Sequence, residues 1–285
     1  MPDSRVPLTI ESDAAHVRVL RTGATAPVAV QNFEADTRAF LHPIAVPGTD
    51  VPITEDAPSH HPWQHGLYVG INDINGAGFW HEGLHPDITG DGTFHPQLVG
   101  TPEVVDDAAR WTVRSEYRDE AGATLLHETQ AWSMVDLGRD AVLDLTLTFH
   151  AERDLTFGRY DYGGLFIRMP YRAEAGGRAF TSEGLEGGEA DGQRARWAAA
   201  EMPIPGLAGE ATLAILDHPR NREHPAPWRV DHELGIAPSI CVAGPWNLAA
   251  GADETFRLRV LIFDRAVEAS VIDAAWTRFA ANGEV

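Results

Sequence analysis

Residues 124–150 read TLLHETQAWSMVDLGRDAVLDLTLTFH, and this stretch carries the clearest structural pattern in the chain. In its second half, apolar residues from Leu143 to Phe149 alternate with polar ones, and the first half, Thr124 to Val135, alternates in the same way. A period of two places the apolar side chains on one face of a strand. The segment 136–140 between the halves contains Gly138 and two aspartates, so the whole stretch predicts a β-hairpin.

Short runs with the composition of strands recur on both sides of this hairpin. They lie at residues 17–20, 26–33, 67–71, 110–117, 164–169, 211–216 and 256–263. Residues 266–279 instead show helical spacing, with Val267, Val271 and Phe279 on the apolar face. The sequence therefore predicts an all-β protein, a large antiparallel β-sandwich with a C-terminal helix, in one domain over residues 1–285.

The composition excludes several classes of function. The 285 residues include 42 acidic and 22 basic side chains, all of the basic ones are arginine, and the formal net charge is −20. Without lysine the chain cannot form a Schiff base, and without a basic patch we expect no nucleic-acid partner. The single cysteine, Cys241, rules out an intramolecular disulfide and lies in an apolar run that predicts burial.

Two further features bear on where the protein acts. No stretch approaches the roughly 18 consecutive apolar residues of a membrane-spanning helix. Residues 1–5 also lack the charged-then-apolar pattern of a secretory signal. The sequence thus predicts a cytoplasmic protein with no membrane partner.

Histidines concentrate in one part of the chain. Seven of the thirteen lie between His42 and His95, and the densest segment is 59–66, SHHPWQHG. Pro62 and Gly66 disfavour a helix there, so a loop feeding the strand at 67–71 is expected. The imidazoles could line a pocket as acid–base groups or metal ligands, or they could be hydrogen-bonded structural residues at loop ends.

Three other motifs contain residues of the same kinds. In segment 72–82, Asn75-Gly76 predicts a turn, and Trp80 offers a plate for stacking on a sugar ring. His81 and Glu82 would point to opposite faces of a regular strand, so only one of them need be catalytic. Segment 217–228 is a proline-stiffened loop that could be functional or only solvated, and Arg168 could anchor a ligand or pair with a carboxylate.

The first hypothesis from these motifs assigns a role to each candidate residue. The acid–base residues are His60, His61, His65, His218, Glu82 and Asp217. The substrate-binding residues are Asn75, Trp80, Arg168, Tyr162, Asn221, His224, Trp228 and His42. The residues of segments 59–82 and 217–228 are expected to face each other across a cleft.

Taken together the motifs resemble the DUF6807 family, whose members are often labelled PmoA-like or "methane oxygenase PmoA". The matching segments span residues 36–265 and are 38–43, 59–67, 73–80, 163–168, 217–219, 224–225 and Trp228. The resemblance implies a galactose-mutarotase-like β-sandwich and a role in sugar catabolism. Trp63 and Gln64 stand where the family tends to have histidine, which weakens the case for a metal site at those positions.

The sequence leaves three hypotheses for function. The first is a carbohydrate-processing enzyme of hydrolase, lyase or epimerase type that acts on a sugar or glycoside and requires no cofactor. The second is an enzyme with a histidine-based metal site, an oxygenase if the family label holds, and the third is a non-catalytic sugar-binding module. The metal content and the formation of a homo-oligomer are left open.

Overall fold

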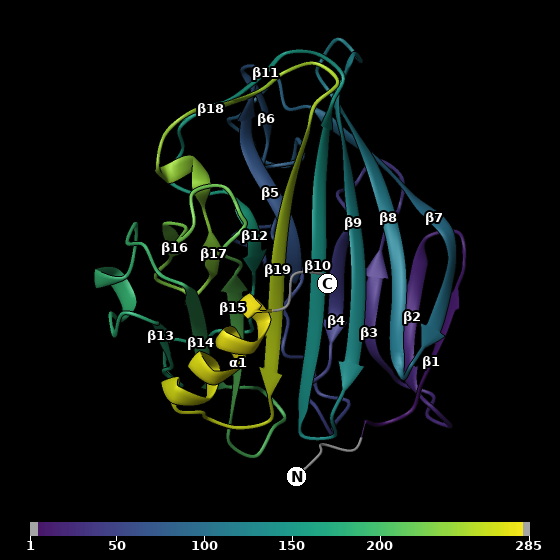
Figure 1. The fold of residues 1–285 in the computed structure, drawn as a ribbon, viewed down its shortest axis with the longest axis vertical. Coiled ribbons are helices and arrows are strands. Elements are labelled where there is room, and N and C mark those ends of the chain that lie inside the picture. Colours follow the sequence, from purple (N-terminus) through teal and green to yellow (C-terminus); the bar gives the residue numbers. More distant parts are fainter. Residues whose placement is uncertain (1–4, 282–285) are drawn as a thin grey trace.

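The computed structural model describes residues 5–281, which form two large antiparallel sheets packed face to face (Figure 1). The first sheet has the order β1 (Leu8–Ser12), β2 (His16–Arg21), β3 (Pro27–Asn32), β4 (Phe40–Ile44), β5 (Leu67–Ile74), β12 (Gly164–Ile167), β17 (Ile236–Pro238) and β16 (Trp228–Val230). The short strands β6 (Ala77–Phe79), β11 (Leu155–Phe157) and β18 (Trp246–Leu248) pair beside this path. The first and last four residues of the predicted domain, including most of the segment compared with a secretory signal, lie outside the described range.

The second sheet consists mostly of long strands. Its order is β13 (Arg178–Thr181), β14 (Trp197–Pro203), β15 (Glu210–Asp217), β19 (Asp253–Phe263), β10 (Asp140–Ala151), β9 (Thr124–Asp136), β8 (Ala108–Arg118) and β7 (Thr93–Val105). Strands β9 and β10 form the predicted hairpin, with Val135 opposite Val142. The predicted all-β sandwich is therefore confirmed.

The alternation in the sequence fixes which side chains enter the core. In β10, Leu143, Leu145, Leu147 and Phe149 are buried between the sheets, while the intervening residues are half-buried on the outer face. Each fully buried leucine or phenylalanine contributes about 1.5–3 kcal/mol through removal of apolar surface from water. The hydrophobic effect thus selects the register in which the sheets pack.

The C-terminal helix α1 (Ala269–Ala281) covers the outer face of the second sheet over β14, β15 and β19 (Figure 1). It begins three residues after the predicted start, and the backbone N–H of Val267 before it donates to the Glu201 carboxylate. Ile272 and Phe279 are the buried residues of the helix. Val271, predicted on the apolar face, is exposed, because the face that packs on the sheet is the one that carries Ile272.

A second aromatic layer lies on the outer face of the first sheet. Tyr68 of β5 and Phe166 of β12 point away from the core and pack with Trp63 and Trp80, while their strand neighbours point into the core. Phe40 and Tyr162 pack partly buried against this group. The aromatic layer is the base on which the candidate site is built.

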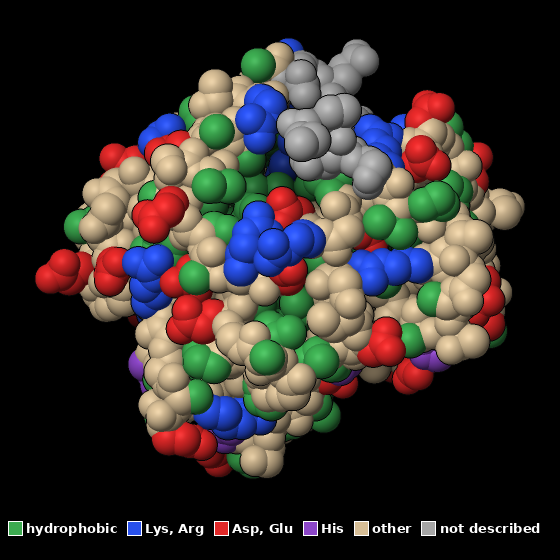
Figure 2. Space-filling model, turned by 90° about the horizontal axis from the view of Figure 1, so that it is seen from below, with side chains coloured by type: hydrophobic (Ala, Val, Ile, Leu, Met, Phe, Trp, Pro, Cys, Tyr) green, Lys and Arg blue, Asp and Glu red, His purple; other side chains and the backbone are tan. Residues whose placement is uncertain are grey.

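Two further predictions can be compared with the structure. Cys241 is buried, as its apolar surroundings predicted. None of the helices within residues 5–281 is long and apolar enough to cross a membrane. Figure 2 shows arginine and acidic side chains interspersed on one end of the molecule, where no large patch of a single sign forms.

Candidate functional site

A cavity of about 150 Å³ opens on the aromatic layer of the first sheet. Its walls come from four segments of the chain. They are His61, Trp63, Gln64, Trp80, His81, Tyr162, Phe166, Arg229, Asp231, His232 and Glu233. The volume is about ten times the roughly 10–15 Å³ that a single water needs in such a measure.

The aromatic residues of the cavity pack closely on one another. The ring centroids of Trp80 and Tyr162 lie 4.4 Å apart, and those of Trp80 and Phe166 lie 5.7 Å apart. Trp80 lies directly against the backbone of β5 at Gly70, where an added Cβ would come within 2.6 Å of the indole ring. A glycine is therefore required under Trp80, and it lets the ring lie close to the strand.

At one end of the cavity His60, His61, Glu233 and Arg168 form a polar cluster. The His60 Nε2 lies 3.0 Å from Glu233 Oε1, and the His61 Nδ1 lies 3.7 Å from Glu233 Oε2. Arg168 is buried, donates to Glu233 Oε2 and lies 3.5 Å from Glu55 Oε2. Of the two roles left open for Arg168, the structure therefore displays the pairing with carboxylates.

Burial sets the protonation states around the cavity. It lowers the pKa of both His61 and His81, so both rings are neutral near pH 7. Burial and then the neighbouring Tyr160 raise the pKa of Tyr162, which keeps the phenol protonated. Burial opposes ionisation of Glu233, but the hydrogen bond and the positive charge of Arg168, together with His60 and His61, outweigh burial and lower the pKa of this carboxyl. The cavity thus holds neutral bases, a neutral phenol and a carboxylate.

His81 lines the cavity and has a ring nitrogen without a hydrogen bond among the residues that the structure describes. It is 6% exposed, and its Nδ1 has no hydrogen-bond partner within the described part of the chain. Its ring is held edge-on by Trp63 at 4.9 Å and by His85 at 5.0 Å. Buried polar atoms without a partner are uncommon in proteins, so this ring is a candidate for a functional role.

His65 lies next to the cavity lining but is fully engaged. Its Nδ1 lies 2.7 Å from Asp56 Oδ1, and its Nε2 lies 2.8 Å from Glu82 Oε2. Glu82 also pairs with buried Arg38 at 3.1 Å. The prediction that His81 and Glu82 point to opposite faces assumed a strand, but β6 ends at Phe79. Glu82 lies against His65, and His81 lines the cavity. We assign His65 and Glu82 to holding the loop, because both ring nitrogens of His65 already have partners.

Two predicted substrate-binding residues, Asn75 and His42, have hydrogen-bond partners within the fold and do not line the cavity. Asn75 occupies the turn between β5 and β6, where its amide donates to Asp154 O and accepts from Thr156 N. His42 bonds to the Thr54 hydroxyl at 2.9 Å. We therefore leave both out of the candidate site.

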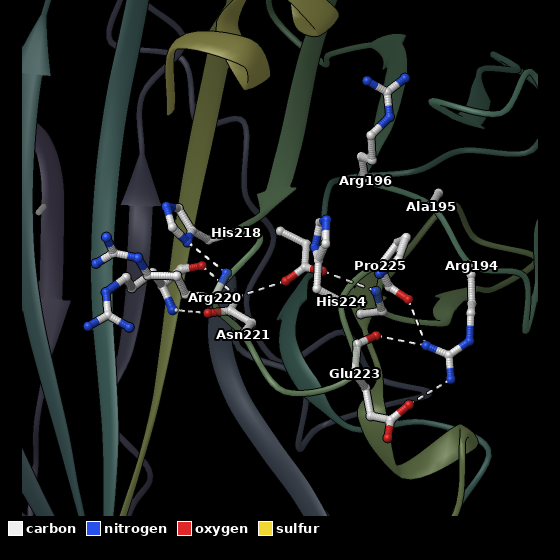
Figure 3. A network of polar contacts seen from close by, with 12 residues as sticks. Arg194, Ala195, Arg196, His218, Arg220, Asn221, Glu223, His224 and Pro225 are labelled. Carbon is white, nitrogen blue, oxygen red and sulfur yellow. Dashed lines mark hydrogen bonds and ion pairs between the residues drawn. The ribbon is translucent and has the colours of Figure 1, made fainter. Parts of the chain in front are cut away.

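The Asp217 loop, residues 217–228, lies at the end of β15 and makes a dense network of its own (Figure 3). Asp217 is buried and accepts from Asn221 Nδ2 at 2.7 Å and from Ala226 N at 3.0 Å, and it lies 2.6 Å from His224 Nδ1. Asn221 also exchanges two 2.7 Å hydrogen bonds with the backbone of Arg257. These bonds fix the shape of the loop.

The same loop packs against the C-terminal helix. His218 contacts Phe279 edge-on at 5.0 Å, and His224 stacks on Trp276 at 6.1 Å. Trp228 is buried and donates from its indole to Ala195 O. The cavity opens on the outer face of the first sheet, and the structure does not bring this loop to the histidines of segment 59–66. The loop meets segment 59–82 at a second pocket, which Asp217, Asn221 and Ala226 line together with Val69 and Ile71.

The predicted site is therefore divided. Of the fourteen assigned residues, the structure groups His60, His61, Trp80, Tyr162 and Arg168 in or directly behind the cavity. Of the pair His81 and Glu82, the sequence led us to assign Glu82, and segment 229–233, which reads RVDHE, was not among the predicted residues. This segment directly follows Trp228 and has four titratable residues in five positions, a density that could have marked it as a candidate.

Comparison with solved structures finds only distant likenesses. An α-galactosidase from Lactobacillus brevis aligns at 13% identity over 89% of this chain and 39% of its own, with a TM-score of 0.41. The GH36 α-galactosidase AgaB from Geobacillus stearothermophilus aligns at 12% identity over 91% and 41%, with a TM-score of 0.45. The Slr1438 protein from Synechocystis sp. PCC 6803 aligns at 12% identity over 92% and 97%, with a TM-score of 0.40.

These likenesses carry no conclusion about activity. The chain spans about two fifths of the length of the two galactosidases. A search of curated protein sequences finds no match. The DUF6807 model, described as a family of unknown function and without the methane oxygenase label, matches residues 24–277, so the chain belongs to the DUF6807 family.

Proposed function

We propose that the protein is a carbohydrate-processing enzyme of the epimerase or lyase type, which moves protons at a sugar carbon inside the cavity on the first sheet. The observation that carries this proposal is the coincidence of Trp63, Trp80 and Tyr162 with unpartnered His81 around one cavity. Aromatic faces stack on the apolar faces of sugar rings, while polar groups between them bind hydroxyls. Arg229, Asp231 and Glu233 supply such polar groups.

In the proposed mechanism His81 is the base. Its neutral ring accepts a proton from the carbon next to a carbonyl or carboxylate group of the sugar, so a C–H bond breaks and an N–H bond forms. The protonated phenol of Tyr162 supplies a proton in return. If the proton goes to the same carbon from the other side the sugar is epimerised, and if it goes to a leaving oxygen a double bond remains. Exchange with water restores both residues.

Hydrolysis is the less suitable chemistry for these residues. A glycosidase needs a carboxylic acid with a raised pKa to protonate the leaving oxygen. The hydrogen bond from Arg168 lowers the pKa of Glu233 despite burial, so this cavity carboxyl stays ionised near neutral pH. The proposal therefore rests on histidine and tyrosine.

The proposal is tested by incubating the protein with aldoses, uronates and glycosides in D₂O and following the sugars by NMR. We expect deuterium incorporation or an unsaturated product, and a His81→Gln rate lower by about 10²–10⁴, the usual worth of one acid–base group. His150→Gln is the matched control, since His150 bonds to Asp253 on the second sheet. Sugar binding without exchange or product would instead identify a binding module, and full activity of His81→Gln would refute the assignment of the base.

A further inference from the structure

The cluster of His60, His61 and Glu233 has the geometry of a metal site. One ligand atom from each of the three residues lies within 4.8 Å of the other two. Taken to the same carboxylate oxygen, Glu233 Oε2, the distances are 3.3 Å from His60 Nε2 and 3.7 Å from His61 Nδ1. Ligands bound tetrahedrally at about 2.0–2.2 Å from an ion lie roughly 3.3–3.6 Å from one another. Little movement is needed to place all three around one ion.

The Nε2 atom of His60 lies between a hydrogen-bond acceptor and a hydrogen-bond donor. Its Nε2 lies 3.0 Å from Glu233 Oε1, which requires a proton on the nitrogen, and 3.0 Å from Arg168 Nη2, which requires a lone pair. One ring nitrogen cannot offer both at once. With a cation bound, the lone pair of His60 and the Glu233 carboxylate would both face the cation, and Arg168 would keep its hydrogen bond to Glu233.

His61 supplies the second observation. Its Nδ1 is buried and has no hydrogen-bond partner among residues 5–281, yet it is the ring atom that faces Glu233. A buried nitrogen left without a proton donor or acceptor costs about 1–3 kcal/mol. Coordination of an ion would satisfy it.

The surrounding residues hold the three ligands in place. The His61 ring packs edge-on against His60 at 4.9 Å and against Trp63 at 5.5 Å. Glu233 is held by its backbone N–H, which donates to Asp231 Oδ1 at 2.9 Å, and by Arg168 on its carboxylate. Metal-binding carboxylates are commonly oriented by a second hydrogen bond of this kind. Glu55 on the far side of Arg168 offsets the guanidinium charge.

We propose that His60, His61 and Glu233 bind a divalent transition-metal ion of the Zn²⁺ class at the rim of the cavity, with a coordination position open to a ligand. Two imidazoles and one carboxylate suit such an ion and leave a fourth position free. In the role we assign to it, which rests on the proposed function, the ion binds sugar oxygens while His81 moves the proton. The binding of the ion does not depend on that function.

Calorimetric titration of the chelator-treated, full-length protein with ZnCl₂ tests the proposal. We expect one strongly bound ion per chain, and a rise in Tm at saturating zinc. His61→Ala and Glu233→Gln should each weaken binding at least tenfold and abolish the rise in Tm. His61→Ala is the safer variant for folding, because Glu233→Gln changes the partner of a buried arginine.

A second histidine–carboxylate group serves as the matched control. His127 lies 3.0 Å and His150 4.0 Å from Glu152, at the far end of β9 and β10. His150→Ala should leave zinc binding unchanged. Absence of stoichiometric binding, binding unaltered in both site variants, or binding lost in His150→Ala would each overturn the proposal. Zinc binding without sugar turnover would uphold the ion site and contradict only the proposed function, whereas turnover by protein that binds no zinc would do the reverse.

Discussion

Two segments of this protein look alike in sequence and differ in structure. The cavity segment, 59–66, and the Asp217 loop both contain histidines, prolines and a tryptophan. In the Asp217 loop both carboxylate oxygens of Asp217 have partners, and Asn221 is bonded at both ends of its amide. Beside the cavity, His61 and His81 each keep a buried ring nitrogen without a hydrogen bond inside the described region.

This contrast indicates which polar groups of a histidine-rich protein are candidates for a functional role. Polar groups that satisfy one another stabilise a fold, and they have little capacity left for a ligand. Polar groups that stay unsatisfied at a cavity cost stability, so a role in binding or catalysis is the natural reason for their presence. Composition alone does not separate the two cases.

The largest expected effect on stability is that of Asp217→Ala. Removing one partner from a buried ionic network costs about 3–5 kcal/mol. For a chain of this length each kcal/mol lowers Tm by roughly 2–4 °C, so a drop of about 10 °C is expected in a thermal unfolding scan. Zinc or sugar binding by the folded variant should be unchanged at 25 °C. A variant with normal Tm and lost binding would show that the Asp217 loop has a functional role and not a structural one.

Glu82→Gln should also lower the stability of the protein, although Glu82 lies near the cavity. Burial raises the pKa of Glu82, but Arg38 and the His65 hydrogen bond outweigh burial and lower it to about 2 from 4.5. This lowering of the pKa corresponds to a contribution of about 3 kcal/mol to the free energy of unfolding at neutral pH. Because the folded pKa is depressed, this stabilisation is complete above pH 4.5 and is lost as the pH falls toward 2.

The contribution of His65 to folding stability has the opposite pH dependence and is lost on the alkaline side. Burial lowers its pKa, but hydrogen bonds to Asp56 and Glu82 more than compensate and raise it above 6.5. Its contribution is complete below pH 6.5 and is lost as the pH rises through the raised pKa. The stability gap between wild type and Glu82→Gln, measured by urea unfolding, should therefore be widest between about pH 4.5 and 6.5. A gap that does not vary with pH would contradict this account.

The smallest expected effect is that of Trp276→Phe. The substitution removes the 2.8 Å hydrogen bond from the indole to the backbone carbonyl of Asp217 and keeps an aromatic ring beside His224. A lost hydrogen bond of this kind costs about 1 kcal/mol, or roughly 2–4 °C in Tm. A loss of catalytic activity in this variant, with Tm unchanged, would show that the Asp217 loop has a functional role.

The sequence predicted the fold better than the site, for physical reasons. Alternation in 124–150 follows directly from burial of one strand face, and the C-terminal helix follows from its own periodicity. The site depends on which loops meet on the first sheet, and no local pattern encodes that Glu233 would meet His60 and His61. The extent of the single domain and the state of assembly remain predictions.

The most direct test of the central claim compares the turnover of His81→Gln with that of His224→Gln on the same sugar substrate. Both residues are largely buried histidines, but only the first lines the cavity. The account predicts a loss of about 10²–10⁴-fold for His81→Gln and a rate within threefold of wild type for folded His224→Gln. Equal losses in the two variants, or the larger loss in His224→Gln, would contradict it.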